Sequence, residues 1–320
     1  MATMISMKQR VRAEKFLNDA EKTLKKSTWF SSSTEQKYED AAELYDQAAN
    51  AYKVGQMNSE AGVAYMKAAE LYRDKLSNQM EGSKALSNAG SCLKKVNAAE
   101  AVKAYNQAVS LLCDAGRLNQ AAKLSKQIAE MYENDSSAVA DESVDPTVLA
   151  IESYQQASDL FEMENAKSQA SQCKAKVAEL SSAQLDPPDL LKGAEIYENL
   201  GRECLENNLL KYNAKGYFLQ SCLCHLANGD AIAASQSLSR FESLDFTFGE
   251  SREGKFVSGL IEAIENFDSE SFATICFEFD RISKLDPWKT SMLVKVKRSI
   301  DDQSGDVGQG ADDGDDVDLT

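Results

Sequence analysis

A recurring pairing of alanine with tyrosine is the sequence feature that most constrains the fold. The copies are Ala42, Tyr45 and Ala48; Tyr65 and Ala68; Ala101, Tyr105 and Ala108; and Ala150, Tyr154 and Ala157. Spacings of three and four place these side chains on one face of an α-helix. Together with weaker copies between them, the marks recur about every twenty residues, which indicates a helix pair about every forty.

This period predicts an all-α fold, a tetratricopeptide-like right-handed solenoid of helical hairpins closed by a C-terminal helical bundle. We interpret the repeated alanines and tyrosines as core, because small alanines let helices approach closely while tyrosine fills the space opposite. Gly55, Gly90 and Gly116 are predicted to end helices. No alternating stretch of Val, Ile and Thr typical of strands is present in the sequence.

Changes in composition predict three parts of the chain. Residues 1–244 are expected to form the solenoid, including an N-terminal loop at 27–33. Residues 245–300 are richer in Phe, Ile and Leu and are expected to form the C-terminal helical bundle. Residues 301–320 hold eight Asp and no Lys or Arg, which predicts a disordered acidic tail.

Charge is distributed unevenly along the chain. The net charge is -16, from 51 acidic and 35 basic residues, yet residues 1–26 carry seven basic against three acidic side chains. A basic beginning and an acidic tail indicate different partners at the two ends. The overall acidity argues against a protein that wraps a nucleic-acid duplex. No apolar run is long enough to span a membrane, so a cytoplasmic protein is the expectation.

The residues that carry enzyme chemistry are sparse. With His225 as the only histidine, catalytic triads and multi-histidine metal sites are excluded within one chain. Gly249, Gly254 and Lys255 approach a phosphate-binding loop, but Phe256 follows where Ser or Thr should hold magnesium. The Cys222-x-Cys224-His225 group lacks a second ligand pair, and we interpret it as core. We therefore expect no enzyme activity, no metal and no cofactor.

The roles of two short segments, one near each end of the chain, can each be interpreted in two ways. Trp29 and Phe30 lie in a serine-rich segment after Lys25 and Lys26. They either pack onto the following helix as a hydrophobic staple or insert into an anionic membrane surface. Leu319, the penultimate residue, either is solvated or serves as an apolar docking point in a flexible acidic arm.

Four segments carry a resemblance to a known family. They are residues 38–50 (YEDAAELYDQAAN), 114–123 (DAGRLNQAAK), 210–218 (LKYNAKGYF) and 285–293 (LDPWKTSML). The first is general repeat sequence, whereas the last two are more specific because repeat packing does not require them. In these segments the chain resembles the soluble NSF attachment proteins, specifically the alpha type, which are adaptors for the NSF ATPase.

The resemblance implies both a function and its site residues. Such adaptors bind the acidic SNARE four-helix bundle laterally and recruit and stimulate the hexameric NSF ATPase, which disassembles the bundle in vesicle fusion and intracellular transport. The implied SNARE-binding residues, expected along one wall of the solenoid, are Lys53, Arg117, Lys123, Lys176, Lys215 and Arg252. The implied ATPase-binding residues are Asp230, Glu262, Glu265, Asp318 and Leu319. Trp29 and Phe30 match the family's membrane-contact loop.

The function expected from the sequence is therefore a non-enzymatic adaptor, peripheral on the cytosolic face of membranes. Its partners are a SNARE complex and the NSF ATPase, with weak membrane contact and with neither nucleic acid nor a small-molecule substrate. One alternative is a generic tetratricopeptide-type scaffold that grips peptides, as co-chaperones do. A second alternative, a helical hydrolase or nucleotide binder, is disfavoured by the single histidine and the incomplete phosphate loop.

Overall fold

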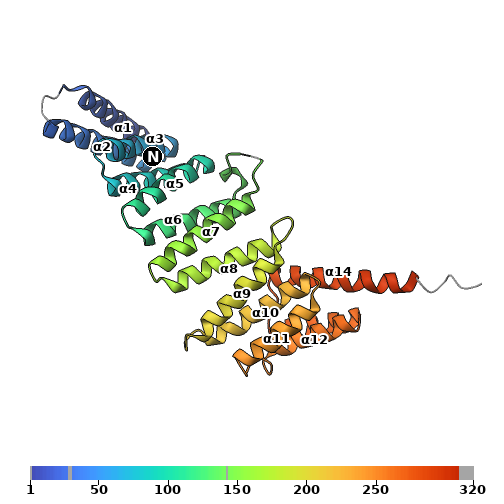
Figure 1. Cartoon of the computed structure of the whole chain (residues 1–320). Coiled ribbons are helices and arrows are strands. Elements are labelled where there is room, and N and C mark those ends of the chain that lie inside the picture. The colour runs from blue at the N-terminus through green and yellow to red at the C-terminus, as the bar shows by residue number, and fades with distance from the viewer. Residues whose placement is uncertain (1, 28–30, 142, 310–320) are drawn as a thin grey trace, which may run out of the picture. The chain divides into compact units, whose positions relative to one another are not determined.

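A computed structural model describes residues 2–27, 31–141 and 143–309 (Figure 1). This part of the chain forms fourteen α-helices and two short 3₁₀ helices, without any strand. The predicted all-α fold of successive helical hairpins is confirmed. The helices are α1 (Ala2–Lys25), α2 (Ser31–Val54), α3 (Asn58–Asp74), α4 (Gln79–Leu93), α5 (Ala98–Asp114), α6 (Leu118–Asn134), η1 (Ser136–Ala138), α7 (Pro146–Met163), α8 (Lys167–Ala183), α9 (Leu190–Leu205), η2 (Lys211–Asn213), α10 (Ala214–Ala227), α11 (Ala231–Leu244), α12 (Arg252–Glu265), α13 (Ser269–Ile282) and α14 (Pro287–Gln309).

The chain divides into two compact units, which are described separately. Unit 1 comprises residues 1–173 and unit 2 residues 174–320, so that the division falls within α8. Residues 245–300, predicted as a bundle of their own, share one hydrophobic core with α9, α10 and α11 in unit 2.

Each helix of unit 1 packs against the next, from α1 to α7 (Figure 1). The alanines and tyrosines of the repeat are buried, with Tyr65 at 2% and Tyr105 at 1% exposure. Short turns with polar caps join the helices: the Asn97 side chain, for example, accepts a hydrogen bond from the Glu100 amide. Short connections make sequential neighbours antiparallel, so α2, α4 and α6 run in one direction and end at the same edge of the unit.

The prediction for Gly90 was wrong, whereas Gly55 and Gly116 do follow helix ends. Gly116 has φ +67°, a left-handed conformation that suits glycine after the C-terminus of α5. Gly90 instead lies inside α4, where a Cβ atom would stand 2.6 Å from the Tyr105 ring. Glycine is needed there because the ring lies directly against the α4 backbone.

Unit 2 has a core rich in aromatic side chains. Phe218 stacks on Phe241 with ring centroids 4.2 Å apart, and Phe248 meets Phe218 edge-on at 5.6 Å. On the other side of the core, the buried Trp288 indole donates a hydrogen bond to the Ser182 hydroxyl at 2.9 Å. This bond ties the start of α14 to the end of α8.

Helix α14 continues to Gln309, beyond the helix end expected at residue 300. At that point Ile300 is buried, and the Ser269 hydroxyl donates to the Asp301 carboxylate at 2.7 Å. Residues 310–320 lie outside the described part of the chain.

Candidate partner-binding surfaces

One side of unit 1 is marked by tyrosine hydroxyls that reach the surface from buried rings. Tyr65 donates to the Asn50 side chain at 2.8 Å, and Tyr105 accepts from Gln127 at 2.8 Å and lies 3.2 Å from the Ser91 hydroxyl. Such bonds are required because a buried phenol needs a partner for its hydroxyl. We call this side of unit 1, defined by these five residues, the tyrosine face.

Two of the predicted SNARE-binding residues flank the tyrosine face. Lys53 lies three residues after Asn50 on α2, and Lys123 lies four residues before Gln127 on α6, spacings that share a helix face. Both side chains are exposed, and neither forms an ion pair with any described residue.

Arg117 lies at a different edge of unit 1 from Lys53. It is the N-cap residue of α6, about one and a half turns before Lys123, whereas Lys53 is in the last turn of α2. Because α2 and α6 run in the same direction, the structure separates Arg117 from Lys53 by roughly a helix length, about 25 Å.

One further lysine, Lys95, which did not stand out in the sequence, lies near Lys53. Burial raises the pKa of the Cys92 thiol, and the charges of Lys53 and Lys95 oppose this rise, which places both ammonium groups near Cys92. Lys94 and Lys95 occupy the turn after α4, about one repeat period after Lys53. This spacing could have predicted from the sequence that they lie at an equivalent position of the next repeat.

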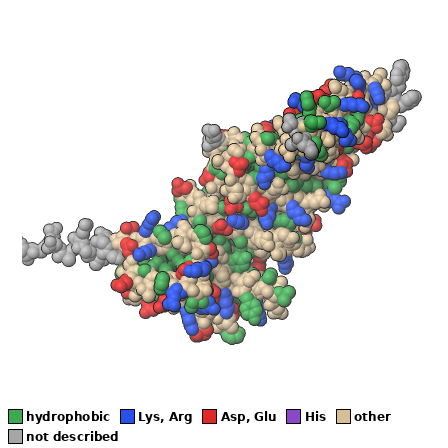
Figure 2. Space-filling model, turned by 180° about the vertical axis from the view of Figure 1, so that it is seen from behind, with side chains coloured by type: hydrophobic (Ala, Val, Ile, Leu, Met, Phe, Trp, Pro, Cys, Tyr) green, Lys and Arg blue, Asp and Glu red, His purple; other side chains and the backbone are tan. Residues whose placement is uncertain are grey.

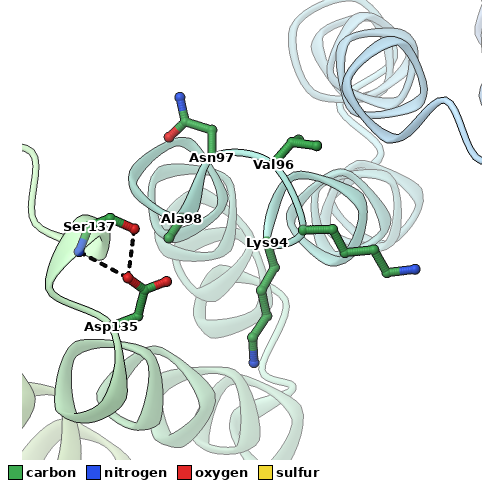
Figure 3. Close-up of a pocket in the computed structure, with 7 residues that line it drawn as sticks. Lys94, Val96, Asn97, Ala98, Asp135 and Ser137 are labelled. Atoms are coloured by element: carbon green, nitrogen blue, oxygen red, sulfur yellow. Dashed lines mark hydrogen bonds between the residues drawn. The ribbon is translucent and has the colours of Figure 1, made fainter.

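An open polar pocket of about 320 Å³ lies at the same turn (Figure 3). Lys94 and Asn97 come from the α4–α5 turn, and Asp135 and Ser137 come from the segment around η1 on the other side (Figure 3). The Asp135 carboxylate accepts from the Ser137 amide at 3.0 Å and from its hydroxyl at 2.6 Å. The lining is polar and holds no His or Cys, and the Asp135 carboxylate is engaged by Ser137 of its own turn.

In unit 2, the structure brings Lys215 and Arg252 to one end of the helices. The Lys215 ammonium donates to the Thr247 carbonyl oxygen at 3.4 Å, and the Arg252 guanidinium donates to the Ser283 hydroxyl at 3.2 Å. We call this end of unit 2, formed by residues 206–213, 245–251 and 283–286, the Lys215 end.

Charge at the Lys215 end is only partly compensated. Lys255 pairs with Glu250, and Lys284 and Lys289 pair with aspartates nearby in sequence. Lys215 and Arg252, by contrast, bond only to neutral oxygens among the described residues. Their positive charges therefore remain available to an acidic partner.

The Lys215 end also exposes apolar side chains that were not among the site residues expected from the sequence. Phe246 is 89% exposed on the α11–α12 loop, Leu209 and Tyr212 are exposed between α9 and α10, and Ile282 is exposed at the end of α13. Large exposed side chains at three neighbouring segments are typical of a binding surface. The sequence could have indicated these exposed side chains, because apolar residues there lie within otherwise polar connecting segments.

The opposite end of unit 2 collects the predicted ATPase-facing acids. Asp230 caps the start of α11, while Glu262 and Glu265 lie in the last turns of α12. Asp268 at the start of α13 and Asp301 on α14 join them, since Ser269 bonds to Asp301. We call this the Glu262 end; the helices α10 to α13 have fourteen residues each, which separates it from the Lys215 end by about 20 Å.

The remaining predicted site residues are placed as follows. Lys176 lies on α8 in unit 2, where its ammonium pairs with Glu179 at 3.3 Å, so its charge is locally balanced. Trp29, Phe30, Asp318 and Leu319 lie outside the described residues.

The motifs considered for chemistry have structural roles. Cys222 and Cys224 are fully buried in the unit 2 core, as predicted, and burial raises the pKa of Cys224 to about 12. Burial lowers the pKa of His225, against the opposing charge of Asp230. In the part of the chain that the structure covers, no group of three His, Cys, Asp or Glu residues is arranged to hold a metal ion.

The glycine–lysine motif is explained by packing. A Cβ atom on Gly254 would lie 2.2 Å from the Phe248 carbonyl oxygen, so only glycine fits this close backbone approach. Lys255 is paired with Glu250 at 3.0 Å, and the Ser251 hydroxyl caps α12 by accepting from the Gly254 amide. The motif therefore starts a helix without forming a phosphate loop. No helix among the described residues combines the length and apolar character required to cross a membrane.

Stacked helical hairpins with separate surfaces of unpaired cations and clustered acids define an all-helical binding protein. The family model described as soluble NSF attachment protein, SNAP, matches residues 11–301. The chain is 38% identical to the alpha-soluble NSF attachment protein of Vitis vinifera over 90% of this chain and 94% of that protein. It is 36% identical to the beta-soluble NSF attachment protein of Bos taurus, covering 87% of each. It is 34% identical to the vesicular-fusion protein SEC17 of Komagataella phaffii, over 86% of this chain and 90% of that protein.

The chain belongs to the soluble NSF attachment protein family. The resemblance drawn from residues 38–50, 114–123, 210–218 and 285–293 is thereby confirmed, and the expectation of a non-enzymatic protein agrees with this membership.

Proposed function

We propose that this chain is an adaptor that binds assembled SNARE complexes laterally and recruits and stimulates the NSF ATPase for their disassembly in vesicle fusion. The observation that carries the proposal is the separation of two charged surfaces in unit 2. Unpaired Lys215 and Arg252 mark one end, while Asp230, Glu262 and Glu265 gather at the other. An adaptor between an acidic bundle and a second protein needs two such independent surfaces.

The proposed SNARE-binding residues come from each unit separately. In unit 1 they are Lys53 and Lys123 beside the tyrosine face, with Arg117 as a further cation and Lys95 adding charge near Lys53. In unit 2, Lys176 joins Lys215 and Arg252 as a further cation. Charge complementarity steers the encounter with the acidic bundle and fixes its register. Several weak contacts become strong when copies of the adaptor act together on one anchored target.

The ATPase-binding surface is the Glu262 end, extended by Asp318 and Leu319. In this role the adaptor makes and breaks no covalent bond; the ATPase supplies the force that the adaptor transmits. The proposed location is the cytosol, at the cytosolic face of membranes, with weak attachment through Trp29 and Phe30.

Charge reversal at each end of unit 2 tests the two surfaces separately. Lys215→Glu with Arg252→Glu should lower capture of a purified SNARE complex by about tenfold or more, because two attractive contacts become repulsive. Glu262→Lys with Glu265→Lys should leave capture intact and reduce ATPase-driven disassembly. Lys192→Glu is the matched control, since it reverses one exposed cation at the start of α9, away from the Lys215 end.

Salt dependence provides an independent check. Capture should weaken steeply as the salt rises from about 0.1 to about 0.5 M, because the Debye length then falls well below the separation of exposed charges. Salt-insensitive capture, or full capture by the Lys215/Arg252 double variant, would reject the cationic surface as the SNARE contact.

A further inference from the structure

The first half of α1 carries a row of exposed apolar side chains. Met4 is 79%, Met7 72% and Val11 65% exposed. Their spacing of three and then four residues places them on one side of the helix. Three large apolar side chains in one outward row form a patch, in contrast with the scattered single residues that any protein surface shows.

The row is exposed although α1 is firmly packed. Ala13 and Ala20 on the opposite side of α1 are fully buried against the core of unit 1. Near the start of the helix, the Ser6 hydroxyl donates to the Gly55 carbonyl oxygen at 3.1 Å. Large apolar side chains on a helix that is packed on its other side are expected to be covered, so this exposed row on α1 requires an explanation.

Basic residues accompany the apolar row. Lys8 and Lys15 recur at seven-residue spacing on the same side of α1 as Met4 and Val11. Neither lysine pairs with an acidic side chain in the described ranges, whereas Arg10 pairs with Glu14 at 3.1 Å. Figure 2 shows Lys and Arg side chains mixed with exposed hydrophobic ones over the N-terminal helices.

We propose that this surface, defined by Met4, Met7, Val11, Lys8 and Lys15 and named the α1 outer surface, binds the headgroup region of anionic phospholipid membranes. An apolar row flanked by lysines is typical of helices that lie in the plane of a membrane interface. The apolar side chains enter the acyl boundary, and the ammonium groups contact lipid phosphates and carboxylates. Three partly inserted side chains give weak, reversible attachment.

This contact is separate from the segment that holds Trp29 and Phe30. The 24 residues of α1 span about 36 Å, and the α1 outer surface occupies the half of the helix remote from that segment. A second copy of the chain is a less suitable occupant than lipid, because a symmetric pairing of α1 would set Lys8 and Lys15 against their own counterparts.

The experiment is flotation of the full chain with vesicles, in the absence of SNAREs and ATPase. The vesicles are pure phosphatidylcholine or contain phosphatidylserine at about one third, and the background carries Trp29→Ser with Phe30→Ser so that only other contacts are measured. The triple variant Met4→Ser, Met7→Ser, Val11→Ser should bind the anionic vesicles with about tenfold lower affinity. Lys8→Glu with Lys15→Glu should lose binding to anionic vesicles only.

Matched controls separate lipid binding from general effects. Met163→Ser and Lys103→Glu change exposed residues of unit 1 outside α1 and should leave flotation unchanged. Since the changed side chains are exposed, thermal unfolding should also be unchanged.

Several results would overturn the proposal. Unchanged flotation of both α1 variants is one. Another is a native chain that self-associates in solution while its apolar variant is monomeric, which would assign the row to a second copy. A third is normal flotation combined with weaker capture of detergent-solubilised SNARE complex, which would assign the row to a protein partner.

Discussion

In unit 1 neighbouring helices approach one another over alanine and tyrosine, whereas in unit 2 they pack largely over phenylalanine and tryptophan. Two core clusters of unit 1 are dominated by fully buried alanines, with tyrosines between them. The cluster of unit 2 contains Phe218, Phe241, Phe248 and Trp288. The same all-helical architecture is thus stabilised by close approach in one unit and by large apolar side chains in the other.

This difference has a consequence for where polar groups lie. Each buried tyrosine of unit 1 must hydrogen-bond its hydroxyl, so partners such as Asn50 and Gln127 are drawn to one long side of the repeat. Phenylalanine imposes no such demand, and the candidate charged surfaces of unit 2 lie at the helix ends, near Lys215 and near Glu262. Repeats therefore produce an extended face, and the bundle produces two separate ends.

The largest expected effect comes from removing an aromatic ring in unit 2. Phe241→Ala deletes a fully buried ring that stacks on Phe218 and meets Phe248, and it should lower the free energy of unfolding by about 3–5 kcal/mol. Pulsed hydrogen–deuterium exchange in urea, read by mass spectrometry, reports each unit separately and should place the loss in unit 2. Tyr212→Ala removes an exposed ring and serves as control; equal losses for the two variants would contradict the proposed importance of the stack.

Unit 1 should be sensitive to enlargement where its helices approach closely. Gly90→Ala introduces a Cβ atom 2.6 Å from the Tyr105 ring, which cannot move away easily because Gln127 and Ser91 hold its hydroxyl. The clash should cost about 1–3 kcal/mol, more than the gain of about 1 kcal/mol from the better helix propensity of alanine.

The matched control for Gly90 is Gly259→Ala in α12. There the new Cβ would stand 3.3 Å from the terminal Cδ1 of Ile275, an atom at the end of a flexible side chain. The substitution should be neutral or stabilising in the same exchange experiment. If Gly90→Ala stabilised unit 1 as much as Gly259→Ala stabilised unit 2, the close approach of helices at Gly90 would not exclude a larger residue there.

The repeat could be predicted from the sequence because its signal is local. Alanine and tyrosine at spacings of three and four define one helix face without any knowledge of distant residues, and Tyr45, Tyr65, Tyr105, Tyr154 and Tyr197 are indeed buried. Gly90 was misread because glycine gives the same signal at a turn and at a close approach between helices. Only the position of the Tyr105 ring distinguishes the two.

The arrangement of the candidate surfaces depended on tertiary contacts. Lys215 and Arg252 start different helices, and the bonds to Thr247 and Ser283 that join their neighbourhoods leave no sequence pattern. The bond from Ser269 to Asp301, which joins the start of α13 to α14, leaves no sequence pattern either. The family resemblance named the residues, whereas the separation into two ends of unit 2 required the structure.

The smallest expected effect is a change in the pH dependence of stability, caused by a half-buried carboxyl in unit 1, that of Asp46. Burial raises the pKa of Asp46 to about 6, although the Tyr72 hydroxyl donates to this carboxylate at 3.3 Å and opposes the rise. Because the folded-state pKa is raised, the contribution of Asp46 to stability is fully present below its ordinary value near 4 and is lost as pH rises through about 6.

Asp46→Asn should therefore remove a pH dependence that is confined to unit 1. The free energy of unfolding of unit 1 should fall by about 1 kcal/mol between pH 4 and pH 7 in the native chain and stay flat over the same step in the variant, after allowance for partial solvent screening. Urea unfolding with pulsed exchange at several pH values measures this difference, with unit 2 as the internal reference. A variant whose unit 1 keeps the native slope would show that another group titrates there. A pH slope of equal size in unit 2 would contradict this contrast between the units. In unit 1 the hydroxyl of a buried tyrosine bonds a carboxylate, whereas the core of unit 2 is built mainly from rings without hydroxyls.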